Sequence, residues 1–209
     1  QYCKRNYGKG MMGYMEKTCY RFFGGFLSAQ EKWLNKMAGE GYRLAHVGKL
    51  AYKFETYGSG KVQYREEFIG AKPKEDAEEY YGFLESFGYR VFYKNINLNA
   101  SLGKIRWRPW AGKGGKIASN ATTYNRELLI VEKADNGKPF ELHTTYEDKQ
   151  GYYKALGKPY LSLALMSAAL GISMQAWAFC IFSACSLIPF GAYQAELFRL
   201  KKQSREKEW

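Results

Sequence analysis

Hydrophobic and polar positions divide the chain into two parts. Up to residue 158 charged residues recur every few positions, whereas the 37 residues 159–195 contain no Asp, Glu, Lys or Arg. A helix needs roughly 20 residues to cross the hydrocarbon core of a bilayer. The uncharged run is therefore slightly short of two crossings, and the long side chains of Lys158 and Arg199 can make up the difference by snorkelling to the interface.

Residues 171–175 are the polar, helix-breaking part of this run and predict the turn of a helical hairpin. Helices are expected at about 159–172 and 175–197, forming an integral membrane hairpin over 159–197. The first helix carries small residues that let the second approach closely, namely Ser162, Ala164, Ser167, Ala168 and Gly171. Two alternatives stay open: a buried hairpin of a soluble domain, and a single span preceded by a segment that lies in the membrane interface.

Basic residues flank the uncharged run on both sides and are missing from its turn. Three lysines precede it between residues 149 and 158, and a basic tail follows at residues 198–209. Because cytoplasmic flanks of membrane helices are enriched in Lys and Arg, both termini are expected on the cytoplasmic side of a bacterial inner membrane. No apolar segment of a secretory signal opens the sequence, and residues 1–14, before Met15, are expected to be a poorly ordered extension.

Residues 15–158 alternate between helical and strand patterns and predict an α+β domain. One helix is expected to start at a capping box of Ser28 and Glu31, with Trp33 on its apolar face. A second helix is expected from Pro73 to Gly88, with acidic residues in its first turns. Its apolar stripe comprises Ala77, Tyr80, Tyr81, Leu84 and Phe87.

Strands are predicted at 20–23, 43–57, 61–69 and 89–93, the middle two joined as a hairpin by Gly58-Ser59-Gly60. Alternation along these strands predicts a sheet with one packed and one solvent-exposed face. The order strand, helix, strand, strand, helix, strand is that of a ferredoxin-like antiparallel sheet domain. An extra hairpin is expected from 127–133 and 139–144, followed by a helix from about residue 145 that continues into the membrane.

Positive charge is concentrated in one segment of the domain. The 209-residue chain has a net charge of +12, and residues 96–126, a basic loop without acidic residues, carry half of it. The residues that suit an anionic surface are Lys104, Arg106, Trp107, Arg108, Trp110, Lys113 and Lys116. An anionic lipid surface is the favoured ligand, since each cation contributes roughly 1 kcal/mol there and Trp prefers the interface. Nucleic-acid binding is disfavoured, and a solvated loop with its tryptophans folded back on the sheet stays open.

Motifs of nucleotide and metal chemistry are incomplete. The run GKGGK at 112–116 lacks a phosphate-binding loop's spacing, because Trp110 and Ile117 occupy the positions of a required Gly and a required Ser or Thr. Two histidines, His46 and His143, leave little for a metal site and are expected to be structural. We therefore expect neither a metal nor a cofactor.

Three further side chains lie in settings that call for an explanation. Glu66 falls on the packed face of its strand, where it either anchors a ligand or is satisfied by a neighbouring Tyr or Arg. Cys180 and Cys185 are expected to be packing residues of the second membrane helix. Four cysteines are too few for a disulfide scaffold. Since no nucleophile or carboxylate pair stands out, the chain is expected to be non-enzymatic.

Two segments resemble a known family. EKWLNKMAGEGYRL at 31–44 and KPFELHTTYEDK at 138–149 are similar to sequences of the bacterial domain of unknown function 2812 family. The resemblance covers about residues 15–158 and implies a small membrane-associated protein in which hydrophobic helices follow a soluble domain. It provides no catalytic residues to transfer. Members are often thought of as companions of small transcriptional regulators, which implies sensing or signalling.

These observations lead to one main functional hypothesis. The chain is expected to be a membrane-anchored cytoplasmic module that binds a partner protein or small ligand and signals or regulates at the inner membrane face. An accessory subunit of a membrane transporter is one alternative, and an enzyme acting on lipid or envelope precursors is another. The sequence identifies neither the partner nor the oligomeric state.

Overall fold

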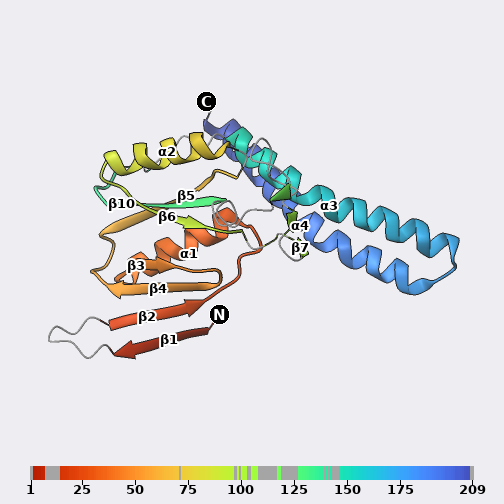
Figure 1. Ribbon diagram of the computed structural model, residues 1–209, viewed down its shortest axis with the longest axis horizontal. Helices are drawn as coiled ribbons and strands as arrows, with labels where there is room; N and C mark the ends of the chain where they lie inside the picture. Colours follow the sequence, from red (N-terminus) through yellow and green to blue (C-terminus); the bar gives the residue numbers. More distant parts are fainter. Residues whose placement is uncertain are drawn as a thin grey trace. The chain divides into compact units, whose positions relative to one another are not determined.

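The computed structural model describes residues 2–7, 15–70, 72–96, 98, 100–102, 105–107, 117–118, 127–138, 140, 142 and 146–207. The chain forms two compact units, Gln1–Leu142 and His143–Trp209 (Figure 1). The elements of the first unit are β1 (Tyr2–Tyr7), β2 (Met15–Tyr20), α1 (Leu27–Gly39), β3 (Tyr42–Val47), β4 (Ala51–Thr56), β5 (Val62–Phe68), α2 (Lys74–Ser86), β6 (Arg90–Lys94), β7 (Ala100–Leu102), β8 (Ile105–Trp107), β9 (Ile117–Ala118) and β10 (Leu128–Ala134). The predicted α+β class is confirmed.

The strands of this unit divide among three antiparallel sheets. The first sheet has the order β1-β2-β4-β3, the second β5-β10-β6, and the third, formed by short strands, β7-β8-β9. The single ferredoxin-like sheet is therefore not confirmed.

Helix α1 packs between the first two sheets (Figure 1). Trp33, Leu34 and Met37 recur at helical spacing and are buried. They join one core cluster with Tyr52 and Phe54 of the first sheet and with Tyr64 and Ile130 of the second. The predicted capping box is wrong, because Phe26 is the N-cap residue and makes no side-chain cap hydrogen bond. The helix is therefore held mainly by its apolar contacts.

Helix α2 covers the opposite face of the second sheet. Ala77 and Leu84 are buried in a cluster with Leu129 and Val131 of β10. This sheet is thus packed on both faces, unlike the half-exposed sheet that alternation predicted. Glu67 of β5 is buried under α2 and accepts a hydrogen bond from the Tyr80 hydroxyl. Phe87, assigned to the apolar stripe, is 62% exposed.

Two predicted connections differ from the observed ones. The predicted strand 43–57 is a hairpin of β3 and β4, with a turn at residues 48–50. Gly58-Ser59-Gly60 then links the first sheet to the second. The expected hairpin of β4 and β5 is therefore not formed. The apolar run Leu128–Val131 is buried on both faces, which places β10 in the centre between β5 and β6.

The two ends of the α+β unit also differ from the sequence expectations. Residues 2–7, expected to be poorly ordered, form β1, which pairs along its whole length with β2. In the expected extra hairpin, 127–133 corresponds to β10, whereas Phe140 and Leu142 of the second arm are not in a strand. The other residues of that arm, 139, 141, 143 and 144, lie outside the described part of the chain.

Candidate functional site

The second unit is a pair of long helices, α3 (Tyr146–Ser173) and α4 (Trp177–Lys207), joined by a turn at residues 174–176 (Figure 1). The predicted helical hairpin and its turn are therefore observed. So is the helix beginning near residue 145, which runs through Pro159 into the apolar segment without a break. Helix α4 also extends through most of the basic tail, well beyond the expected end near residue 197.

Small residues allow α3 and α4 to approach closely. A Cβ at Gly171 would lie 2.8 Å from Cys180 Sγ and 3.3 Å from the Cys180 backbone nitrogen. The Ser183 hydroxyl donates to the Ala164 carbonyl at 2.8 Å, and Ala164 and Ser167 are buried. Cys180 lies at this contact, where only a hydrogen at position 171 leaves room for it. Both Cys180 and Cys185, expected to be packing residues, are nevertheless exposed.

The outer surfaces of both helices are apolar and uncovered. Both helices, over Lys149–Ser173 and Trp177–Ser204, are long and apolar enough to cross a membrane, yet only 28% and 17% of the residues in their apolar 18-residue windows are buried. The large exposed side chains include Leu163, Leu165, Met166, Leu170, Ile172, Trp177, Ile181, Phe182, Leu187 and Ile188. The core helices of a soluble protein would cover such side chains.

Charged and aromatic groups mark the ends of the apolar hairpin. Because α3 and α4 run antiparallel, the lysines of α3 and the basic residues of α4 share the end away from the turn. There the rings of Tyr153 and Tyr160 lie 6.2 and 6.0 Å from the ring of Tyr193. Trp177, which is 75% exposed, lies next to the turn at the other end. Aromatic groups at both ends of an apolar segment are typical of membrane helices.

A buried carboxylate links the two main sheets of the α+β unit. Glu132 of β10 is 2% exposed and pairs with Arg43 of β3 at 2.6 Å and Arg90 of β6 at 3.3 Å. The Tyr64 hydroxyl donates to Glu132 at 2.7 Å and accepts from the Leu44 backbone N–H at 2.8 Å. Burial, reinforced by the charge of Glu132, raises the pKa of Tyr64. The cluster keeps this tyrosine protonated and holds the sheets together.

A second buried cluster surrounds Lys94 at the end of β6. Its ammonium donates to the Gly48 carbonyl at 2.7 Å and to the Lys49 carbonyl, and lies 5.0 Å from the Tyr52 ring centroid. Burial lowers the pKa of Lys94 to about 8, opposed by the charge of Glu66. Burial and the same carboxylate raise the pKa of Tyr52. Glu66 therefore acts electrostatically on a lysine and a tyrosine inside the core.

Side chains of α1 cap the outer edge of β5. The Asn35 amide donates to the Tyr64 carbonyl and accepts from the Tyr64 N–H, both at 2.9 Å. Glu31 accepts from the Glu66 N–H at 3.4 Å. These contacts replace the hydrogen bonds that a neighbouring strand would make, and so protect the edge of the sheet.

A pocket lies beside this capped edge. Its volume is about 460 Å³ and it is lined by Asn35, Gln63, Tyr64, Arg65, Gly137, Lys138 and Phe140. The guanidinium of Arg65 pairs with Glu31 and donates from Nε to the Phe140 carbonyl at 2.7 Å, which fixes its position. Volumes of this order hold small ligands, and Arg65 with the exposed Lys138 supplies two cations.

The candidate anionic-surface residues are only partly visible in the structure. Lys104, Arg108, Trp110, Lys113 and Lys116 lie outside the described residues. Arg106 and Trp107 belong to β8, which pairs with β7 and β9. The basic loop thus contains strands, and its binding to an anionic surface stays a prediction.

The remaining sequence candidates give no metal centre in the part of the chain that the structure describes. His46 is exposed on β3. His143 lies outside the described residues. No group of three or more His, Cys, Asp or Glu side chains suited to a metal ion occurs among the residues described.

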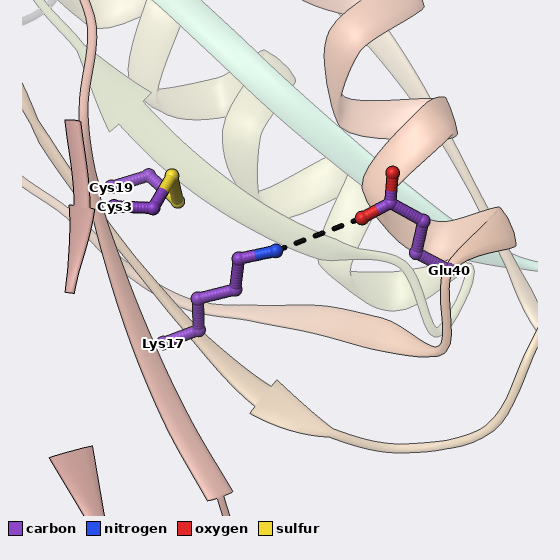
Figure 2. The surroundings of a disulfide bond; sticks show 4 residues. All are labelled: Cys3, Lys17, Cys19 and Glu40. Atoms are coloured by element: carbon purple, nitrogen blue, oxygen red, sulfur yellow. Dashed lines mark ion pairs between the residues drawn. A yellow bond between two sulfur atoms is a disulfide. The ribbon is translucent and has the colours of Figure 1, made fainter. Parts of the chain in front are cut away.

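A disulfide that the sequence patterns did not predict joins β1 and β2. Cys3 of β1 and Cys19 of β2 are bonded, and their Cα atoms are 4.0 Å apart (Figure 2). The two residues face each other in the strand register. Their separation of 16 residues gives no signal until β1 is recognised as a strand, and residues 1–14 were expected to be an extension.

Comparisons with known proteins agree with the resemblance seen in the sequence. The family model described as "Protein of unknown function (DUF2812)" matches residues 27–165, more than half of the chain. The match includes most of the α+β unit and the first part of α3. No curated protein and no solved structure matches the chain. The chain belongs to the DUF2812 family.

Proposed function

We propose that this chain is a non-enzymatic, membrane-anchored binding module. Helices α3 and α4 hold it in the bacterial inner membrane with both ends in the cytoplasm. The α+β unit binds a partner protein or a small ligand and signals or regulates at the membrane face.

The uncovered apolar surface of the hairpin carries the anchoring part of the proposal. Side chains such as Leu165 and Ile188 are 64% and 72% exposed, and removing each from water is favourable by roughly 1.5–3 kcal/mol. Lipid tails supply that environment. The helices satisfy their own backbone hydrogen bonds, as a bilayer requires. The shared charged end and the uncharged turn support insertion from the cytoplasmic side.

The pocket beside β5 supports the binding part of the proposal. The exposed Lys138, beside an Arg65 whose charge is shared with Glu31, favours a small ligand carrying a carboxylate or phosphate. The basic segment 96–126 adds attraction to an anionic lipid surface, which acts on a domain already tethered there. Signalling then consists of a change in what the unit binds at the membrane.

Membrane fractionation and cysteine labelling test the anchoring and its orientation. The full chain should sediment with membranes and resist carbonate extraction at high pH. In a background with Cys180 and Cys185 replaced by Ala, Ser173→Cys should react with an impermeant thiol reagent added from outside. Ser204→Cys should be protected. Recovery in the soluble fraction contradicts the anchor, and the reverse labelling contradicts the orientation.

Copurification separates this proposal from the transporter-subunit alternative. The same uncovered surface of α3 and α4 would also fit against the helices of a polytopic membrane protein. Purification of the full chain in mild detergent, followed by mass spectrometry, should yield the chain without a stoichiometric transporter. A polytopic protein recovered in constant ratio would instead assign the hairpin to a transporter complex.

A further inference from the structure

The disulfide joins an edge strand of the α+β unit to the rest of its sheet. Strand β1 lies at the edge of its sheet and, among the described strands, pairs only with β2. The Cys3–Cys19 bond is the covalent link between these two strands, apart from the connecting chain. Strand β2 is attached independently, since it pairs with β4 and its Lys17 forms an ion pair with Glu40 at the end of α1, at 3.6 Å (Figure 2).

The environments of the two sulfur atoms differ. Cys19 is fully buried in the core cluster that contains Trp33 and Tyr52, whereas Cys3 is only partly buried against that cluster. An attacking thiolate from solvent therefore reaches Cys3 first. Disulfides are uncommon in reducing compartments, and those found there are usually transient or redox-sensing.

We propose that Cys3–Cys19 is a reversible thiol–disulfide switch that controls whether β1 is docked on β2. This inference rests on the cytoplasmic orientation proposed above, because that compartment supplies reducing dithiols. The co-reactant is a protein dithiol of the thioredoxin class. This class of reductant is inferred only from the chemistry needed to reduce a disulfide.

The exchange balances as a two-electron reduction. A thiolate of the dithiol attacks Cys3 Sγ, forms a mixed disulfide and releases the Cys19 thiolate, which takes up a proton. The second thiol of the reductant then attacks its own partner sulfur, closes the reductant's disulfide and releases Cys3 as a thiol. The products are two cysteine thiols and one oxidised dithiol, and the reverse reaction restores the bond.

Reduction changes the surface that the sheet presents. Without the bond, β1 is a six-residue edge strand held by its pairing with β2 and by the partly buried side chain of Cys3. Its release leaves the outer edge of β2 with unpaired backbone N–H and C=O groups. Such an edge accepts another extended segment. The switch therefore couples the redox state of the compartment to an interaction surface.

Hydrogen exchange on the full chain in detergent tests the switch. The oxidised chain should protect the amides of β1, and dithiothreitol should raise their exchange rate at least tenfold, with a smaller rise in β2 and none in α1. Cys3→Ser should reproduce the effect without reductant, and Cys185→Ser, which replaces an exposed free cysteine of α4, should not. Equal protection of β1 in the reduced chain overturns the proposal.

Trapping of the mixed disulfide identifies the sulfur atom that the reductant attacks. Its result is independent of the orientation of the chain in the membrane. A thioredoxin-class protein whose second cysteine is replaced should form a mixed disulfide with Cys3, identified by peptide mapping. Attachment at Cys19 contradicts the proposed exchange. If the exchange and trapping results hold but Ser204→Cys is labelled from outside the cell, the switch chemistry stands and the cytoplasmic orientation fails. If labelling supports the orientation while β1 stays protected on reduction, only the switch fails.

Discussion

The two units of this protein expose opposite kinds of surface, and their tryptophans show the difference. Trp33 of α1 is 5% exposed and packs against Phe23, Tyr52 and Phe54, with ring centroids 5.0 to 5.9 Å apart within this group. Trp177 of α4 is 75% exposed. The α+β unit thus removes its apolar groups from water by folding. The hairpin leaves many of its apolar groups exposed, a surface that suits an apolar solvent better than water.

The placement of charged residues also distinguishes the two units. The α+β unit buries Glu132 and Lys94 and satisfies them with arginines, a tyrosine and backbone carbonyls. The hairpin has no charged residue from 159 to 195 and carries its charges at one end. Burying a charge is tolerable where the chain supplies partners for it. In the hairpin, polar contacts such as the hydrogen bond from Ser183 to the Ala164 carbonyl join uncharged groups of adjacent helices.

The largest expected effect comes from placing charge on the exposed surface of the hairpin. Leu165→Arg combined with Ile188→Arg should move most of the chain from the carbonate-resistant membrane fraction to the soluble or aggregated fraction. Each arginine near the centre of a membrane helix opposes insertion by about 2.5–3.5 kcal/mol. The measurement is the distribution between pellet and supernatant after carbonate extraction.

A matched control uses an exposed apolar residue of the other unit. Phe87, at the end of α2, is 62% exposed, close to the 64% of Leu165, and Phe87→Arg should leave the fractionation unchanged. If the double variant and Phe87→Arg behave alike, the exposed surfaces of the two units face the same solvent, and the contrast between them is wrong.

The second prediction compares the two tryptophans directly. Trp33→Ala should lower the free energy of unfolding by about 3–5 kcal/mol, because it opens a cavity in a core shared by α1 and both main sheets. Trp177→Ala should change it by less than about 1 kcal/mol, as expected of an exposed side chain. Circular dichroism of the purified chain in detergent, followed during denaturation, gives both values. A loss below about 1 kcal/mol for Trp33→Ala would show that α1 packs differently.

The third prediction concerns the pH dependence that Lys94 gives to the α+β unit. In the folded chain its pKa is about 8, below the value of 10.5 for the free side chain. Between these values the unfolded chain binds more protons, so the free energy of unfolding should rise with pH, by about 2 kcal/mol from pH 8 to 10. Below about pH 7, where Lys94 is protonated in both the folded and the unfolded chain, this contribution should be constant.

Substitution separates Lys94 from the other titrating groups. Lys94→Met keeps a long side chain without the charge and should remove the rise between pH 8 and 10. The raised pKa values of Tyr52 and Tyr64 oppose the trend only above about pH 10, where free tyrosines ionise. A rise of equal size in the variant would show that Lys94 is not its source.

The sequence predicted the elements that local patterns determine. Helical spacing identified the buried face of α1, and the absence of charge identified the hairpin and its turn. The small residues Ala164, Ser167 and Gly171 were correctly assigned to the contact between α3 and α4. In each case the information lies within a short stretch of consecutive residues.

Pairing between distant segments was not predictable in the same way. Strand β10 enters the centre of the second sheet from more than thirty positions beyond β6, and the polar segment between them gives no pairing signal. Alternation along β5 places Glu67 on the face expected to be exposed to solvent, yet α2 covers this side chain. The pocket beside β5 and the Cys3–Cys19 bond also depend on long-range placement. Their residues could therefore not be grouped from spacing alone.

The smallest expected effect tests the close approach of the two hairpin helices. Gly171→Ala places a methyl group 2.8 Å from Cys180 Sγ and 3.3 Å from backbone, so the helices must separate slightly. We expect a loss of about 1–2 kcal/mol, within the range of overpacking substitutions. Gly191→Ala is the matched control, because no neighbouring side chain or other helix lies within 4 Å of the point its methyl group would occupy, and alanine favours the helix. Thermal denaturation in detergent should show a lower midpoint for Gly171→Ala and an unchanged or higher one for Gly191→Ala. Equal midpoints would mean that α3 and α4 are held by lipid or detergent around them and that the contact at Gly171 contributes nothing measurable.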